Sequence, residues 1–218
     1  MTSWLESKAP TKFDQLMIND STKDALVTAS TSNNPPHLLL SGPNGVGKTA
    51  IMRMFARQVL GPGWKATTHI LNAKDLVRAP GAMKKFEEFL RPGGASSEDT
   101  LAGRTSLDIF SESTIEVLGD SGPPAGVESF GKTSINQIRL SRLIVIEDAD
   151  YLGELRQAYL RRMMEHSSIT SRFIFTTTTP SRLIDALRSR VQHIRIPRYS
   201  RQEIETELIK VTTQEKIE

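Results

Sequence analysis

The chain has 218 residues, of which 38% are hydrophobic, and a formal net charge of +3. That length suits one α/β domain with a small appendage, and the composition supplies enough apolar residues for a core. The absence of cysteine from the sequence excludes disulfides, thiolate catalysis and cysteine-ligated zinc. We expect an intracellular protein, cytoplasmic or nuclear, without membrane contact, because no apolar run approaches the roughly 18 residues of a membrane helix and Met1–Glu6 lacks an apolar signal region.

The predicted elements alternate between helices and strands. In chain order, the first half contains a helix within residues 13–29 capped by Asp20 or Ser21, a strand over 37–41, a helix over 48–60 ended by Gly61, a strand over 68–72 and a helix over 82–90. The second half contains a strand over 143–146, a helix over 153–165, a strand over 172–177, a helix over 181–189 and a strand over 191–196. This pattern predicts a three-layer αβα fold with a mostly parallel sheet, which binds ligands at the carboxyl ends of its strands.

Residues 91–139 do not follow this alternation. They are rich in glycine, proline and serine near 92–97 and again near 119–126. A connection of this length is unusual in a compact domain. We interpret the stretch as an insertion in the core, and we expect a helix over 98–118 within it.

Residues 42–49 read Gly-Pro-Asn-Gly-Val-Gly-Lys-Thr, the complete phosphate-loop pattern G-x-x-x-x-G-K-[ST]. The expected strand and helix flank it in the required order. The glycines let backbone N–H groups turn toward a triphosphate, Lys48 reaches the β- and γ-phosphates, and Thr49 can hold Mg²⁺. We therefore predict an ATP site with Mg²⁺. Its predicted phosphate-binding residues are Gly42, Pro43, Asn44, Gly45, Val46, Gly47, Lys48, Thr49 and Ala50.

Acidic residues follow the predicted strand over 143–146. Glu147 at the strand tip can orient Mg²⁺ through water, and Asp148 can position or polarise the attacking water. Thr178, at the end of the next strand, is placed to hydrogen-bond near the γ-phosphate. The alternative interpretation of these acids is a simple strand-ending turn that caps the following helix.

Basic residues concentrate between Arg156 and Arg201, where ten arginines face only two acids, Glu165 and Asp185. This excess predicts an anionic partner, either the phosphates of a neighbouring subunit's nucleotide or a nucleic-acid backbone. A solvated basic face is the alternative, because the segment lacks an evident set of aromatic residues for base stacking.

Five short motifs follow one another over almost the whole chain. They are Trp4–Pro10, Pro36–Leu40, Leu71–Asp75, Leu160–Glu165 and Arg188–Arg190. Together they resemble the boxes of clamp-loader subunits, in particular the small subunit of replication factor C, an AAA+ ATPase. The resemblance implies a hetero-oligomeric ring or spiral that uses ATP to open a sliding clamp and place it on primer–template DNA, contacted through its phosphate backbone.

The same resemblance implies roles for individual residues. Arg190 would be the arginine finger that reaches into the neighbour's nucleotide site, and Thr178 would be the first sensor. Arg161 or Arg162 would help to couple subunits. Met17 and Ile18 would line the adenine pocket. ATP hydrolysis would then depend on assembly.

Several positions depart from the family pattern, including Ser7-Lys8-Ala9 in place of Lys-Tyr-Arg. The family generally has Asp-Glu where this chain has Glu147-Asp148, commonly has Asn at the position of Thr178, and has Cys at the position of Val191. The exchanged acids withdraw the catalytic carboxylate by one methylene, and a misplacement of about 1 Å can cost on the order of 10²-fold in rate. We expect ATP binding with slow hydrolysis. The alternatives are a nucleotide-binding interaction subunit that does not hydrolyse ATP, and another DNA-directed AAA+ motor.

The resemblance also divides the chain. Residues 1–197 are expected to form the AAA+ core, with the insertion at 91–139, and residues 198–218 the start of a helical lid. In that lid we expect a helix over 199–211, with Ser200 as N-cap and Glu203 completing a capping box. The remainder of the family's lid and its collar domain are not in the sequence, so the chain is either a fragment or assembles by other contacts. Without a collar we expect weak self-association.

Overall fold

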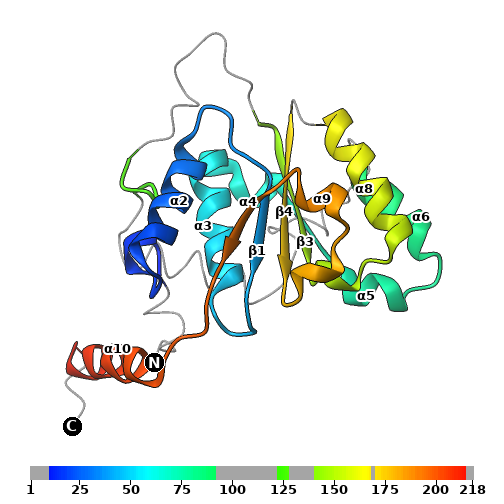
Figure 1. Cartoon of the computed structure of the whole chain (residues 1–218). Coiled ribbons are helices and arrows are strands. Elements are labelled where there is room, and N and C mark those ends of the chain that lie inside the picture. The colour runs from blue at the N-terminus through cyan, green and yellow to red at the C-terminus, as the bar shows by residue number, and fades with distance from the viewer. Residues whose placement is uncertain (1–9, 92–121, 128–139, 168–169, 215–218) are drawn as a thin grey trace.

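A single parallel sheet forms the centre of the computed structural model, which describes residues 10–91, 122–127, 140–167 and 170–214 (Figure 1). The strands are β1 (Leu38–Ser41), β2 (Thr68–Asn72), β3 (Arg142–Glu147), β4 (Ser171–Thr177) and β5 (Gln192–Arg195). Their order is β2-β3-β4-β1-β5, and every pairing is parallel. The predicted α/β fold is confirmed.

The central strands are apolar on both faces because helices cover both faces. In β1, Leu38 and Leu40 pack in the cluster that contains Phe55 of α3 (Lys48–Leu60), whereas Leu39 packs in the opposite cluster. Successive strand residues point to opposite faces, so this alternation places a core on each side. Figure 1 shows α2 (Asp20–Thr31) and α3 on one face, and α5 (Ala73–Arg78), α6 (Ala82–Leu90), α8 (Glu154–Ser167) and α9 (Asp185–Arg188) on the other.

Glycine residues mark the boundaries that the sequence predicted best. The helices over 48–60 and 82–90 have the predicted bounds. Gly61, with a φ of 67°, ends α3, and Gly81, with a φ of 69°, precedes α6. The first half of the chain also contains three short helices: η1 (Phe13–Gln15), η2 (Gly61–Gly63) and α4 (Trp64–Thr67).

Two predicted local features were wrong, and one helix was not predicted. The N-cap of α2 is Asn19, not Asp20 or Ser21, because the Asn19 Oδ1 atom accepts a hydrogen bond of 2.8 Å from the N–H of Thr22. The short helix α5 was not predicted; the side chain of Asn72 caps it by accepting from two backbone N–H groups.

The helix expected over 181–189 is instead η6 (Pro180–Arg182) followed by α9. The chain is extended between them at Leu183 and Ile184, and the Oε1 atom of Gln157 accepts a bond of 2.7 Å from the N–H of Ile184. The side chain of Gln157 in α8 thus accepts the hydrogen bond of a backbone N–H group in this segment. Residues 4–9 of the motif Trp4–Pro10 and the helix expected over 98–118 lie outside the described residues.

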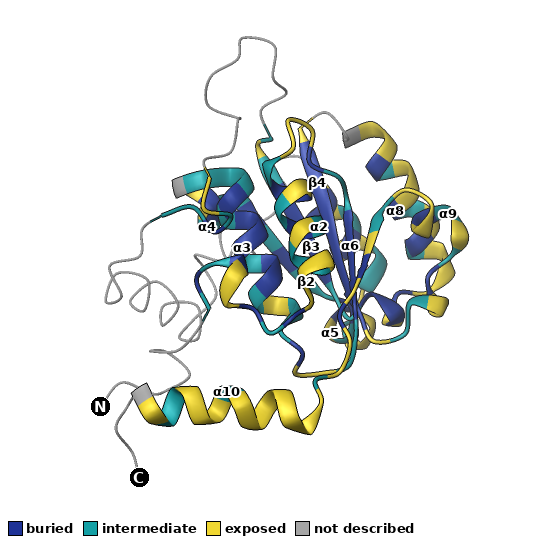
Figure 2. Cartoon of the chain, turned by 60° about the vertical axis from the view of Figure 1, so that its left-hand side comes forward, coloured by how far each residue is buried: buried dark blue, intermediate teal, exposed yellow. Residues whose placement is uncertain are grey.

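The last helix, α10 (Arg201–Gln214), projects from the sheet and is mostly exposed (Figure 2). The predicted capping box is confirmed: the Ser200 N–H donates to Glu203 Oε2 at 2.6 Å, and the Glu203 N–H donates to Ser200 Oγ at 3.2 Å. None of the helices within the described ranges has the length and apolarity that crossing a membrane requires.

Candidate functional site

The phosphate loop joins the carboxyl end of β1 to the start of α3. A Cβ atom on Gly42 would lie 2.3 Å from the carbonyl oxygen of Ile196, so only glycine fits there. Gly45 and Gly47 adopt φ values of 82° and 89°, which favour glycine. Because Gly47 is the N-cap, no side chain caps the first N–H groups of α3. This is the geometry of a helix N-terminus that accepts an anion.

The remaining loop residues divide between core and surface. Val46 is buried in the core and Ala50 packs against it, which anchors the loop. Asn44, Gly45 and Thr49 are exposed. The loop therefore has a fixed base and an accessible outer side.

Lys48 points back onto its own loop. Its Nζ donates to the carbonyl oxygens of Gly42 at 2.8 Å and Pro43 at 2.7 Å. Burial lowers the pKa of the Lys48 ammonium, and the charges of Asp148 and Asp150 act against that shift. The predicted phosphate-binding lysine and the acids after β3 thus lie within electrostatic reach of one another.

The acids that follow β3 reach this loop across β4, because β4 lies between β3 and β1 in the sheet. Glu147 is the last residue of β3 and is half-buried. Asp148 has a φ of 52°, an uncommon backbone conformation for a residue other than glycine. Its N–H donates to Thr176 Oγ1 at 3.3 Å, and its carboxylate lies 3.8 Å from the Nζ of Lys74.

Asp150 is a polar residue of this region to which the sequence analysis gave no role. It is buried and accepts from Thr177 Oγ1 at 2.7 Å and from Thr178 Oγ1 at 3.5 Å. Thr178 itself is exposed and lies immediately after β4. Asp150 therefore joins the end of β3 to the predicted sensor position. Its presence in the same acidic tetrapeptide as Glu147 and Asp148 was the available signal.

The predicted adenine-pocket residues lie on the α3 side of the sheet. Ile18 is buried in the same cluster as Val46, and Met17 is half-buried. Tyr199 was not predicted to belong to the site. Its hydroxyl donates to the carbonyl oxygen of Val46 at 2.9 Å, which connects the segment before α10 to the phosphate loop.

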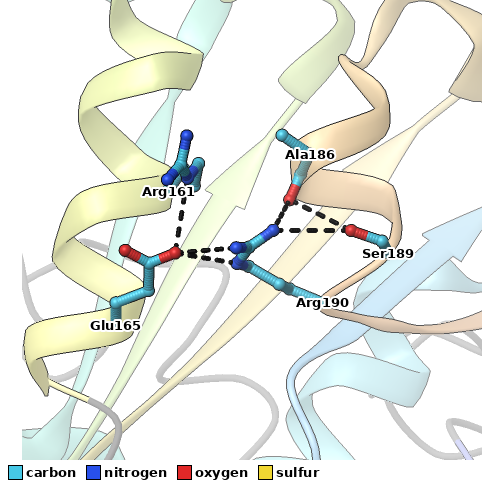
Figure 3. A network of polar contacts seen from close by, with 5 residues as sticks. All are labelled: Arg161, Glu165, Ala186, Ser189 and Arg190. Carbon is cyan, nitrogen blue, oxygen red and sulfur yellow. Dashed lines mark hydrogen bonds and ion pairs between the residues drawn. The ribbon is translucent and has the colours of Figure 1, made fainter.

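Arg190 lies just after α9, and its guanidinium contacts α8 and α9 (Figure 3). Its Nε and Nη2 atoms donate to Glu165 Oε1 at 3.1 and 2.7 Å, and its Nη1 atom donates to the carbonyl oxygen of Ala186 at 2.7 Å. Arg161 donates to the same Glu165 oxygen at 3.3 Å. The other acid of the basic segment, Asp185, pairs with Arg188.

Comparison with known proteins adds an independent finding. Residues 38–199 match the model of a family described as "ATPase family associated with various cellular activities (AAA)". Among curated proteins, the replication factor C small subunits of Methanosarcina barkeri and Methanoregula boonei are 29% and 26% identical over 94% and 100% of this chain. These alignments cover 49% and 55% of the two relatives. The chain therefore spans about half the length of the curated relatives it matches.

Solved structures agree on the fold. Two mutant forms of Thermotoga maritima RuvB superpose with TM-scores of 0.58 and 0.60 at 16% and 14% sequence identity. Each superposition covers 97% of this chain and 56% of the RuvB chain.

Proposed function

This chain belongs to the AAA family of ATPases, and we propose that it binds ATP with Mg²⁺ and acts as a subunit of a clamp-loader-like complex. The observation that carries the proposal is the phosphate loop itself, held between β1 and α3 with Lys48 in electrostatic reach of Asp148 and Asp150. A loop of this form, at the carboxyl edge of a parallel sheet, suits a polyphosphate ligand.

We assign the contacts as follows. The loop from Gly42 to Ala50 would hold the phosphates, and Met17 and Ile18 would line the adenine. Thr49 and Glu147 would hold Mg²⁺. The metal ion would neutralise charge on the phosphates.

Within the same proposal, Asp148 positions the attacking water and Thr178 approaches the γ-phosphate. Two features support slow hydrolysis. Asp148 is one methylene shorter than the glutamate common in the family, and its carboxylate lies 3.8 Å from the ammonium of Lys74. A carboxylate that shares its charge with a lysine is a weaker partner for water. The same two features of Asp148 support the second candidate function, an interaction subunit that binds ATP without hydrolysing it.

The clamp-loader assignment is supported by the relatives named replication factor C small subunit and by the arginines of α8 and α9. The proposed partners are other clamp-loader subunits, a sliding clamp and the phosphate backbone of primer–template DNA, in the cytoplasm or nucleus. Residues 1–197 would form the nucleotide-binding core, and residues 198–218 would begin a helical lid. Arg190 would act on the neighbouring subunit's nucleotide.

ATP binding is tested by substituting Lys48. Loss of two charged hydrogen bonds to phosphate predicts that Lys48→Ala weakens binding of a fluorescent ATP analogue by about 10²-fold or more in the presence of Mg²⁺. Lys84→Ala is the matched control, because Lys84 is an exposed lysine of α6 paired only loosely with Glu88 at 3.9 Å. Equal affinity of Lys48→Ala and wild type would refute the proposed site.

The clamp-loader role is tested in the native complex. The tagged chain is purified from its source, and ATPase activity is measured with clamp and primed DNA. We expect sibling subunits and clamp to copurify, and we expect Arg190→Ala to retain nucleotide binding and lose assembly-dependent turnover. Copurification with ATP bound and without turnover would favour the second candidate. Absence of both clamp and siblings would contradict the loader assignment.

A further inference from the structure

One carboxylate oxygen binds two arginines at the junction of α8 and α9 (Figure 3). Glu165 Oε1 accepts from Arg161 on its own helix and from both Nε and Nη2 of Arg190. These hydrogen bonds hold the pKa of the Glu165 carboxyl below its usual range. The carboxylate is therefore ionised at neutral pH and carries a full charge toward both guanidinium groups.

The donors of Arg190 are only partly used by these contacts. Glu165 takes the side of the guanidinium formed by Nε and Nη2, and the carbonyl oxygen of Ala186 takes one N–H of Nη1. Each terminal nitrogen of a guanidinium carries two N–H groups. Nη1 and Nη2 thus each keep a second N–H group, and the one further contact of Nη1 among the residues that the structure describes is with Ser189 Oγ, at the limiting distance of 3.5 Å. Two donors are left for a bidentate contact with an oxyanion.

The elements that carry this pair are braced against each other. Gln157, buried near the start of α8, donates to the carbonyl oxygens of Leu152 and Arg182 and accepts from the N–H of Ile184. Farther along α8, Leu160 and Met164 pack in one cluster with Leu187 of α9. The backbone before Arg190 is thereby held against α8. Glu165 on α8 therefore binds the side chain of a residue whose backbone position is fixed relative to that helix.

We propose that Glu165 is a positioning residue for Arg190: it fixes the guanidinium so that its two remaining N–H groups face a phosphate of the neighbouring subunit's nucleotide. This inference rests on the proposed action of Arg190 across a subunit interface. It assigns to the last residue of the Leu160–Glu165 motif a role in that interface. The ligand it prepares for is the terminal phosphate of a nucleoside triphosphate.

Stability alone does not account for the contact. The side chains of Arg190 and Glu165 are 35% and 43% exposed, and exposed ion pairs contribute little to folding. Two hydrogen bonds from the Arg190 guanidinium to one oxygen of Glu165 do, however, restrict a long side chain to one orientation. Restricting the orientation of a group before it meets its ligand is what accelerates a reaction without changing affinity.

The test is assembly-dependent ATP hydrolysis in the purified native complex, comparing Glu165→Ala, Glu165→Gln, Arg190→Ala and the double variant Glu165→Ala/Arg190→Ala. Glu205→Ala is the matched control. Glu205 pairs with Arg201 on α10, and the two are four residues apart, as are Glu165 and Arg161 on α8. We expect Glu165→Ala to lower kcat about tenfold, with KM within about twofold of wild type. The double variant should be no slower than Arg190→Ala. Glu165→Gln, which keeps an oxygen acceptor, should restore part of the loss.

A second readout needs no assembly. In the full chain, the Nε–H signal of Arg190, assigned with Arg190→Lys, is followed by ¹⁵N NMR. It should be shifted and slowly exchanging in wild type and in Glu205→Ala, and should move to the position of a free arginine in Glu165→Ala. An unchanged signal in Glu165→Ala would overturn the positioning role.

The outcomes separate this inference from the function on which it rests. If Arg190→Ala leaves turnover unchanged, the proposed action across the interface fails, and the positioning role fails with it. If Arg190→Ala abolishes turnover while Glu165→Ala keeps wild-type kcat, only the positioning role is refuted. A higher kcat in Glu165→Ala would also refute it, because Glu165 would then be a competitor for Arg190. Additive losses in the double variant would indicate a purely structural effect and would count against the proposal.

Discussion

Gly42 is the position at which the phosphate loop has least room, and Gly42→Ala tests that packing. An added Cβ would lie 2.3 Å from the Ile196 carbonyl oxygen, well inside the 3.0 Å below which an atom must shift. Neither backbone moves easily: the Gly42 N–H donates to Thr177 O at 3.1 Å, and the Ile196 N–H donates to Ser41 O at 2.7 Å. Overpacking of this kind costs about 1–3 kcal/mol, and two pinned backbones favour the upper part of that range.

The assay is urea denaturation together with titration of a fluorescent ATP analogue. With a denaturant slope of about 2 kcal/mol per molar urea, a loss of about 2–3 kcal/mol lowers the unfolding midpoint by about 1–1.5 M. ATP binding should weaken as well, because the displaced residue opens the loop. Gly63→Ala is the control: no atom lies within 4 Å of its Cβ position and its φ of −86° suits alanine. A midpoint for Gly42→Ala equal to that of Gly63→Ala would refute the reasoning.

Three further predictions concern stability and loop coupling. Gln157→Leu removes three hydrogen bonds at a buried position and leaves backbone groups of Leu152, Arg182 and Ile184 unpaired, so we expect a loss of about 2–4 kcal/mol in urea denaturation; a loss under about 0.5 kcal/mol would contradict it. Tyr199→Phe removes the bond to Val46 O and should cost about 0.5–1.5 kcal/mol while speeding amide hydrogen exchange at residues 198–200; unchanged exchange there would argue against the coupling. Burial and the charge of Arg172 lower the pKa of His37 from 6.5 to about 4, so between pH 6.5 and pH 4 the unfolded chain takes up a proton that the folded chain does not, and stability should fall by up to about 3 kcal/mol with decreasing pH. His37→Asn should lack this slope, and an equal slope in the variant would disprove the assignment.

The sequence predicted the elements whose ends are set by local chemistry. Glycines lie at both ends of α3 and before α6, and the capping box of α10 is contained within four residues. Fully apolar runs such as Leu143–Ile146 could be assigned to buried strands because only a two-sided layer accommodates them. In each of these cases the deciding interactions lie within a few residues of one another.

The N-cap of α2 and the helix α5 were missed although Asn19 and Asn72 make local contacts. The other missed features depend on residues far apart in the chain. The break between η6 and α9 follows from a hydrogen bond to Gln157, 27 residues away. Tyr199 meets Val46 across 153 residues. Likewise the contact of Lys74 with Asp148 arises from the pairing of β2 with β3. No local pattern in the sequence reports which distant partner a side chain will find once the sheet has formed.

The ammonium of Lys48 already donates hydrogen bonds to two backbone carbonyl oxygens, and a ligand at the loop has to compete with them. An anion can bind the third N–H group of the ammonium, and to take up the other two it must replace the bonds to Gly42 O and Pro43 O. Hydrogen bonds to a charged group contribute about 1.5–3 kcal/mol each, so on the order of 3–6 kcal/mol has to be recovered by the incoming ligand. A small ion with one contact does not recover it, whereas a chain of phosphates that reaches Lys48 and the start of α3 together does. We therefore expect the loop to prefer a polyphosphate over a single phosphate or sulfate ion.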